Sequence, residues 1–276
     1  MRSLRFATLI LLASAVQASA TTRPAARTAR VERAAASRMA MLPAGSYRPL
    51  YAPVGTSRVQ VAAFAIDRDP VTRGDFLAFV SRHPEWQRGR VRPVFADARY
   101  LADWQGAVDA GDAKALRRPV TQVSWFVARA YCASLGKRLP TVDEWEYAAA
   151  ASEGSSDAST DPSFRARLLA LYGAMRGQSS TTTRGFTNVY GVRGLHGVVW
   201  EWTLDFNSVV LDDDSRATGS GVDGRDRHLY CASSAIGATD PSDYAAFLRH
   251  AVRAGLGARS TTSSVGFRCA ADAPVS

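Results

Sequence analysis

The segment from Arg117 to Ala151 limits the possible folds more than any other part of the chain. Ser124 is a residue type that caps helix N-termini, and apolar and aromatic residues follow it at near-helical spacing. Gly136 can adopt the left-handed conformation that commonly ends a helix. This half of the segment therefore predicts a helix that begins after Ser124 and stops near Gly136.

A second helix signal follows directly. Pro140 prevents the first helix from continuing. Thr141 and Glu144 have the spacing of a capping box, in which each side chain accepts a hydrogen bond from a free backbone N–H group. A second helix is therefore predicted to start at Val142.

Two later stretches also carry helix-start signals. In DPSFRARLLALYGAM, Asp161 is expected to cap a helix and Pro162 to occupy its first position. Further along, Asp240 is expected to act as the cap and Pro241 to open a helix, with Asp243 in the first turn, where a negative charge interacts favourably with the helix dipole.

The first twenty residues have the pattern of a secretory signal peptide. Arg2 and Arg5 give a basic start, Phe6 to Val16 form an apolar stretch, and small residues end at Ala20. The apolar stretch is too short to span a membrane stably, so we expect no integral membrane segment. The signal is expected to be cleaved after Ala20, which would leave a periplasmic or secreted protein.

The formal net charge of +9 is concentrated at the N-terminal end. Residues 1–38 contain seven arginines and one glutamate, so only +3 remains for the rest of the chain. Residues 21–40 are rich in Arg and Ala and poor in large apolar groups, which predicts a flexible arm. The mildly basic remainder gives no reason to expect a nucleic-acid partner.

Four ordered stretches of the chain resemble the formylglycine-generating enzyme family, also called sulfatase-modifying factors. Four motifs in the expected order are a more specific signal than any one of them alone. The stretches are FAIDRDPVTRGDFLAFV (64–80), VSWFVARAYCASLGKRLPTVDEWEYAA (123–149), NVYGVRGLHGVVWEWTLDF (188–206) and VGFRCAAD (265–272).

The resemblance implies the fold class and the domain limits. We expect a single irregular α+β domain of the C-type-lectin-like kind, with short strands, few helices and long loops. The domain should cover residues 41–272, after the signal peptide (1–20) and the arm (21–40) and before a short tail (273–276).

The chain has three cysteines, so in an oxidising compartment at least one is left unpaired. In the resembled family, the positions that match Cys132 and Cys269 form a structural disulfide. The resemblance therefore implies a Cys132–Cys269 bond. The alternative is that both are buried reduced thiols.

Cys231 is then the unpaired cysteine. The resembled enzymes use two nearby cysteines that bind one copper(I) ion as thiolates and oxidise a client cysteine to formylglycine, and soft thiolate pairs suit copper(I). Here Asp226 and Ile236, five residues to either side of Cys231, cannot replace a thiolate. Copper is therefore expected only if Cys231 is functional as the catalytic thiol. An inert, buried Cys231 is the equally weighted alternative.

The resemblance also implies a possible calcium site. Its ligands would be the side chain of Glu201 and the backbone carbonyls of Gly197 and Val199, but Gly194 stands where the family has an asparagine. A lost side-chain ligand weakens such a site. The alternatives are a hydrogen-bonded, buried Glu201 and, by fold analogy, a lectin-like site in which calcium contacts a sugar.

Arginines late in the chain are candidates for binding an extended peptide. Arg249 and Arg253 are the main candidates, with Arg259 and Arg268 further along, and a solvated or core-paired role is the alternative. The four histidines lack the spacing of a zinc hydrolase, and there is no glycine-rich phosphate loop after a strand pattern.

The leading hypothesis is an exported formylglycine-generating-enzyme-like protein that binds or helps to mature a periplasmic client protein, without the two-cysteine copper oxidase site. The composition resembles a branch of the family encoded beside periplasmic copper proteins, so a copper enzyme is one candidate client. The alternative is an active oxidase that converts a client cysteine to formylglycine, or a thiol-dependent maturation enzyme that uses Cys231. The sequence does not fix the oligomeric state.

Overall fold

Strands from both ends of the domain form the main sheet. The computed structural model describes residues 38–52, 56–175, 185–207 and 238–273, all within the unit Arg38–Ser276. In the sheet, β4 (Phe64–Asp67) lies between β1 (Met39–Leu42) and β7 (Ala270–Asp272), and both pairings are antiparallel. Residues more than two hundred positions apart therefore meet in one sheet.

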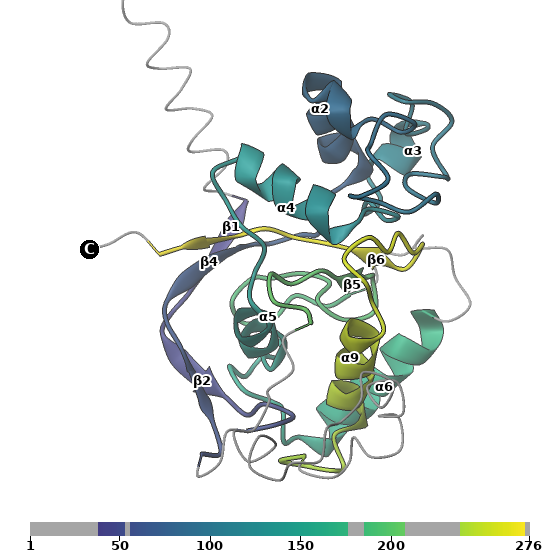
Figure 1. Cartoon of the computed structure of the whole chain (residues 1–276). Helices are drawn as coiled ribbons and strands as arrows, with labels where there is room; N and C mark the ends of the chain where they lie inside the picture. Colours follow the sequence, from purple (N-terminus) through teal and green to yellow (C-terminus); the bar gives the residue numbers. More distant parts are fainter. Residues whose placement is uncertain (1–37, 53–55, 176–184, 208–237, 274–276) are drawn as a thin grey trace, which may run out of the picture. The chain divides into compact units, whose positions relative to one another are not determined.

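The remaining elements are short. Two small sheets pair β2 (Gly45–Tyr47) with β3 (Val59–Val61) and β5 (Trp200–Glu201) with β6 (Val265–Gly266). The helices are α2 (Arg73–Arg82), η1 (Pro84–Trp86), α3 (Ala113–Leu116), α4 (Trp125–Ser134), α5 (Val142–Ala149), α6 (Pro162–Met175) and α9 (Tyr244–Ala254). Figure 1 shows α2, α3 and α4 on one side of β4 and β7, and α5, α6 and α9 on the other.

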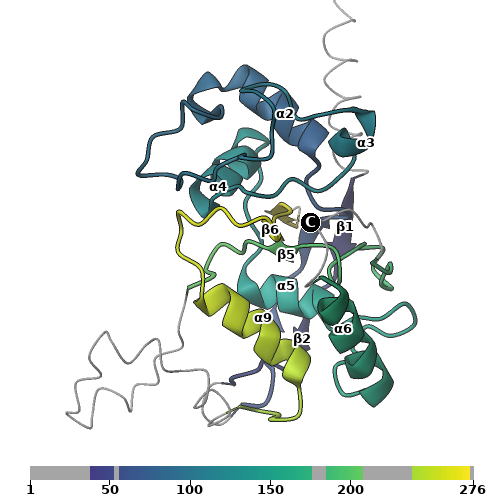
Figure 2. The ribbon, with the colours of Figure 1, turned by 90° about the vertical axis from the view of Figure 1, so that its right-hand side faces the viewer.

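The described side chains form three buried clusters: one around α2 and α4, one in which α5 packs with β1, β2, β3 and β4, and one between α6 and α9. Aromatic rings from α2, α4 and the strand region near β6 pack together, with Phe76 in contact with Tyr131 at 5.8 Å and with Phe267 at 6.1 Å between ring centroids. On the other side, α6 and α9 lie together, as Figure 2 also shows, and bury Phe164, Leu168 and Ala245. The motif residues therefore form the common core, and α6 and α9 add a satellite to it.

The predicted helix pair and fold class are confirmed. Ser124 caps α4, Gly136 follows it with φ +67°, and Thr141 and Glu144 form both hydrogen bonds of the capping box of α5. Together with α6, which begins at Pro162, these elements form an α+β domain with short strands, few helices and long loops.

The predicted start of the last helix is wrong by three residues. Asp243, not Asp240, is the N-cap of α9, because its carboxylate accepts a hydrogen bond from the N–H of Ala246 at 2.9 Å. Asp240 instead accepts hydrogen bonds from Ser242 and pairs with Arg165 at 2.6 Å. Asp240 and Asp243 are both residue types that cap helix N-termini, so the sequence alone did not distinguish them.

The first strand lies partly within the range that the sequence assigns to the arm. β1 begins at Met39, two residues inside the predicted arm, and Ala40 is fully buried opposite Ile66. Of the predicted signal peptide and arm, only residues 38–40 are among those described. No helix within the described ranges is long and apolar enough to cross a membrane.

Candidate functional site

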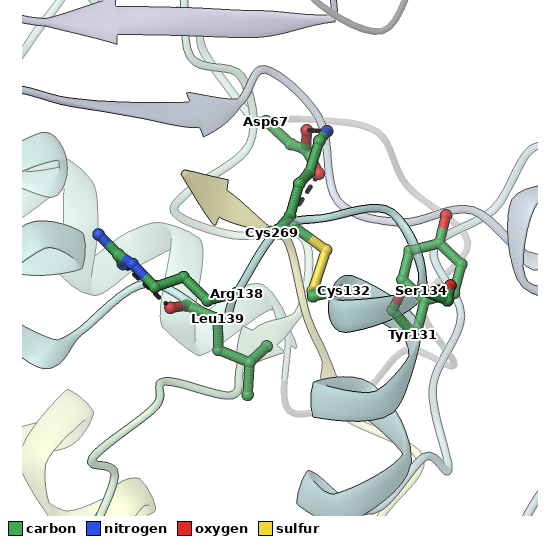
Figure 3. Close-up of a disulfide and its surroundings, with 8 residues drawn as sticks. Asp67, Tyr131, Cys132, Ser134, Arg138, Leu139 and Cys269 are labelled. Carbon is green, nitrogen blue, oxygen red and sulfur yellow. Dashed lines mark hydrogen bonds and ion pairs between the residues drawn. A yellow bond between two sulfur atoms is a disulfide. The ribbon is translucent and has the colours of Figure 1, made fainter. Parts of the chain in front are cut away.

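A buried disulfide joins Cys132 on α4 to Cys269, which lies directly before β7 (Figure 3). The S–S distance is 2.00 Å, and neither cysteine is exposed to solvent. This is the pair that the resemblance implies. Since the chain has three cysteines, Cys231 is the one that remains outside the bond.

Asp67 connects the disulfide to the end of β4. Its carboxylate accepts hydrogen bonds from the Lys137 side chain at 2.6 Å and from the backbone N–H of Cys269 at 3.1 Å. Figure 3 shows Asp67 beside Cys269. The backbone N–H of Asp67 donates to the carbonyl of Cys269 at 2.8 Å. The strand, the turn after α4 and the disulfide are thus held together at one point.

An ion pair between Glu201 and Arg268 lies at the centre of the domain, and both side chains are completely buried. The Arg268 guanidinium donates to the two carboxylate oxygens of Glu201 at 2.8 and 2.9 Å. The indole N–H of Trp145, on α5, donates to the same carboxylate at 2.7 Å. Glu201 is therefore fully engaged with donors from two different segments.

The other donors of Arg268 are also used. Its two Nη atoms donate to the backbone carbonyls of Asp67, Arg68 and Arg193 at 2.9–3.1 Å. With the two bonds to Glu201, all five N–H groups of the guanidinium have acceptors. A buried charge is tolerated under these conditions, because it is both paired and completely hydrogen-bonded.

This arrangement does not fit the calcium site that the resemblance implies. Calcium is bound by six to eight oxygen ligands. A calcium ion at the Glu201 carboxylate would compete with the positive charge of Arg268, and Gly194 offers no side-chain oxygen in place of the family's asparagine. Calcium bound through Glu201 and the carbonyls of Gly197 and Val199 therefore stays an untested prediction, and the donor geometry argues against it.

Arg249 and Arg253, predicted to bind a peptide, both point to Glu146 on α5. The closest nitrogen–oxygen distances are 2.7 Å for Arg249 and 2.6 Å for Arg253, and all three side chains are at most 13% exposed. The Arg253 guanidinium also lies 4.9 Å from the ring centroid of Trp145. The structure thus places these two arginines in the core-paired role that was the alternative, because α9 packs its charged face against α5.

A chain of buried polar groups continues from this cluster. Arg249 Nη1 donates to the Tyr172 hydroxyl at 3.3 Å, and this hydroxyl lies 2.6 Å from Nδ1 of His196. The Nε2 atom of His196 lies 2.9 Å from the carbonyl of Ala149, which can only accept, so Nε2 carries the proton and Tyr172 donates to Nδ1. The chain connects α9, α6 and α5 through their side chains.

Burial and neighbouring charges fix the protonation of these groups. Burial lowers the pKa of His196 to about 3, and the positive charge of Arg249 acts in the same direction. For Glu146, burial alone would raise the pKa, but Arg249 and Arg253 outweigh it and lower the pKa to about 2. Near neutral pH, His196 is neutral and Glu146 is ionised.

One family model matches most of this chain. The family model of the sulfatase-modifying factor enzyme 1-like domain matches residues 24–273. The chain belongs to this family. The inactive C-alpha-formylglycine-generating enzyme 2 of Mus musculus is 30% identical over 253 aligned positions, which cover 78% of this chain and 77% of that protein.

Two further proteins are similar to this chain. The formylglycine-generating enzyme of Mycobacterium tuberculosis is 29% identical over 299 aligned positions, which cover 85% of this chain and 97% of that enzyme. Among solved structures, PvdO from Pseudomonas aeruginosa has a TM-score of 0.43 and 19% identity, with 85% of this chain and 94% of PvdO covered.

The catalytic candidate of this sulfatase-modifying factor domain, Cys231, lies outside the described residues. Its exposure and its role as a copper ligand or reactive thiol stay predictions. In the part of the chain that the structure describes, no group of three or more His, Cys, Asp or Glu residues could hold a metal ion.

The free energy of unfolding of the domain should decrease as the pH is lowered below about 6.5, because His196 is buried in its neutral form. In the unfolded chain its pKa is about 6.5, so between pH 6.5 and 3 the unfolded state binds a proton that the folded state does not. Stability is complete above pH 6.5, and this histidine should lower it by about 2 kcal/mol at pH 5. Glu146 adds a loss in the same direction below about pH 4.5.

Urea unfolding at pH 7 and pH 5 measures this effect. His196→Gln should reduce the difference in unfolding free energy between the two pH values. His83→Gln is the matched control, because His83 is 39% exposed and should leave the difference unchanged. Equal pH dependence in the wild type and in His196→Gln would contradict the prediction.

The polar chain through Tyr172 and His196 was not predicted from the sequence. Tyr172 was part of an expected helix, and His196 was excluded only as a zinc ligand. A single histidine without a metal-binding spacing gives no signal of its own. The available hint was the position of His196 between two motif glycines, Gly194 and Gly197, both of which have positive φ angles in the structure.

Proposed function

We propose that this sulfatase-modifying factor domain is an exported, non-catalytic member of its family that binds a periplasmic client polypeptide. The observation that carries the proposal is the use of the cysteines. Two of the three are joined in the buried Cys132–Cys269 bond, so a single chain has only Cys231 left. A copper(I) site made of two thiolates needs a pair.

The charges of the described core support a structural role for its ionisable groups. Glu201 is hydrogen-bonded to Arg268 and Trp145, and Glu146 is paired with two arginines. General acid–base catalysis works best with a pKa close to the working pH. His196 and Glu146 have pKa values of about 3 and about 2, several units below neutral.

The similarity to an inactive relative from Mus musculus, 30% identical across 78% of this chain, is consistent with a member that has lost catalysis. Export rests on the signal-peptide pattern of residues 1–20, and a copper enzyme is one candidate client. The second candidate function is oxidation of a client cysteine to formylglycine, or another thiol-dependent maturation step. Its basis is the remaining Cys231 and the similarity to the formylglycine-generating enzyme of Mycobacterium tuberculosis.

The test is an assay of cysteine oxidation. Residues 21–276, loaded with copper(I) in the presence of oxygen, should leave a cysteine-containing peptide unchanged by mass spectrometry, while an active formylglycine-generating enzyme converts it under the same conditions. Formation of the aldehyde by the wild type and its loss in Cys231→Ser would overturn the proposal in favour of the second function.

A further inference from the structure

A row of partly exposed aromatic rings lies beside the N-terminal end of α4. In the order Trp86, Phe95, Phe126 and Trp125, neighbouring ring centroids are 5.4, 5.6 and 5.3 Å apart. Arginine side chains lie over two of these rings, Phe95 and Trp125. The aromatic–arginine face defined in this way consists of Trp86, Arg92, Phe95, Trp125, Phe126 and Arg129.

The two arginines of the face have no carboxylate partner among the residues that the structure describes. The Arg92 guanidinium lies 5.7 Å from the centroid of Phe95, and that of Arg129 lies 5.4 Å from Trp125. Both residues are exposed, and neither forms an ion pair with any residue in the described ranges. Arg90 and Arg99, exposed in the same long loop as Arg92, also lack an ion pair there.

The nearby acidic groups do not neutralise this charge. Glu85 faces His83 at 3.4 Å. The carboxylate of Asp97 accepts hydrogen bonds from the backbone N–H groups of Thr261 and Arg99 and from the Thr261 hydroxyl. The face therefore combines partly exposed rings with positive charge that no described carboxylate compensates.

We propose that the aromatic–arginine face binds an acidic segment of a polypeptide, with aromatic or apolar side chains between its carboxylates. This inference rests on the proposed client-binding function and names the chemistry of the bound segment. Trp and Arg are enriched among the residues that dominate protein–protein binding energy. Arginines held over ring faces can each bind a carboxylate through two parallel N–H groups.

The ring geometry favours a polypeptide over a single-stranded nucleic acid. Bases stack on open ring faces. Here the rings meet edge to face, with interplanar angles of 63°, 64° and 78°, and a guanidinium covers one face of Phe95 and one of Trp125. The rings thus present their edges and a shared apolar surface, and they leave few open faces on which a base could stack.

The experiment uses fluorescence anisotropy with residues 21–276 and a labelled peptide of repeated Glu-Phe-Glu-Gly units. The acidic peptide should bind more tightly than its counterpart with Lys in place of Glu, and binding should weaken as salt rises. Arg92→Glu combined with Arg129→Glu should weaken binding at least tenfold. The corresponding double alanine variant, which removes the charges without reversing them, should also weaken it.

The matched control is Arg48→Glu combined with Lys114→Glu, which changes the net charge equally at exposed positions on other elements. It should change the affinity less than threefold. Equal weakening by the control, equal binding of the lysine peptide, or no binding of the acidic peptide would overturn the inference. Tighter binding of an oligothymidine with the same sensitivity to Arg92 and Arg129 would overturn it as well.

The peptide-binding experiment and the oxidation assay test the two proposals independently. If the acidic peptide does not bind and no cysteine peptide is oxidised, the face is wrong and the non-catalytic function stands. If the cysteine peptide is oxidised, the proposed function is wrong whatever the face binds.

Discussion

Replacing both Cys132 and Cys269 by alanine should lower the free energy of unfolding by about 4–5 kcal/mol. The bond joins residues 137 positions apart, and a cross-link that closes so long a loop removes much conformational entropy from the unfolded chain. For a domain of this size, the loss corresponds to a decrease in Tm of roughly 10–20 °C. Urea and thermal unfolding of the oxidised proteins measure both quantities.

Reduction supplies the control. Dithiothreitol should lower the Tm of the wild type toward that of the double alanine variant and leave the variant unchanged. Cys231→Ala should remain as sensitive to the reductant as the wild type, because the Cys132–Cys269 bond does not involve it. A wild-type Tm that does not respond to reduction would contradict the prediction.

Glu201→Gln should lower the free energy of unfolding by about 3–5 kcal/mol. The substitution preserves the size of the side chain but leaves the Arg268 guanidinium buried without a counter-charge, and both side chains are 0% exposed. One of the bonds that Glu201 now accepts, from Arg268 or from Trp145, would also face an amide N–H. Urea unfolding near pH 7 measures the effect.

Glu153→Gln is the matched control for this substitution. Glu153 also forms a two-pronged pair with an arginine, Arg167, at 2.7 and 3.0 Å, but the two side chains are 49% and 43% exposed. Exposed ion pairs contribute little to stability, so the free energy of unfolding should change by no more than about 0.5 kcal/mol. Similar losses in both variants would mean that burial of the Glu201 pair is not what matters.

Local signals in the sequence were sufficient to predict where α4 and α5 begin. Ser124, Thr141 and Glu144 act through neighbours three residues away, and such short-range geometry is written in the order of residues. β1 was missed because its four residues, MAML, follow an arginine-rich arm and are held in place by β4, which follows them after twenty-one intervening residues. Strand pairing of this kind depends on distant residues and leaves little local trace.

The same limit applies to the site. The Cys132–Cys269 pairing came from the family resemblance, but nothing local indicated that Arg249 and Arg253 face Glu146. An arginine on a helix has the same sequence signal whether it faces solvent or a buried carboxylate. Only the packing of α9 on α5 decides between these roles, and it depends on long-range contacts.

The late position of residues 265–272 has a consequence for the order of folding. This one stretch contains β6, the partner of Glu201, the partner of Cys132, and the whole of β7, the third strand of the main sheet. Without this stretch, Glu201 has no counter-ion, β5 has no neighbouring strand and β4 has one open edge. The domain should therefore stay unfolded until this last stretch is present and then fold as a unit, at the slow rate expected when so many contacts join distant residues.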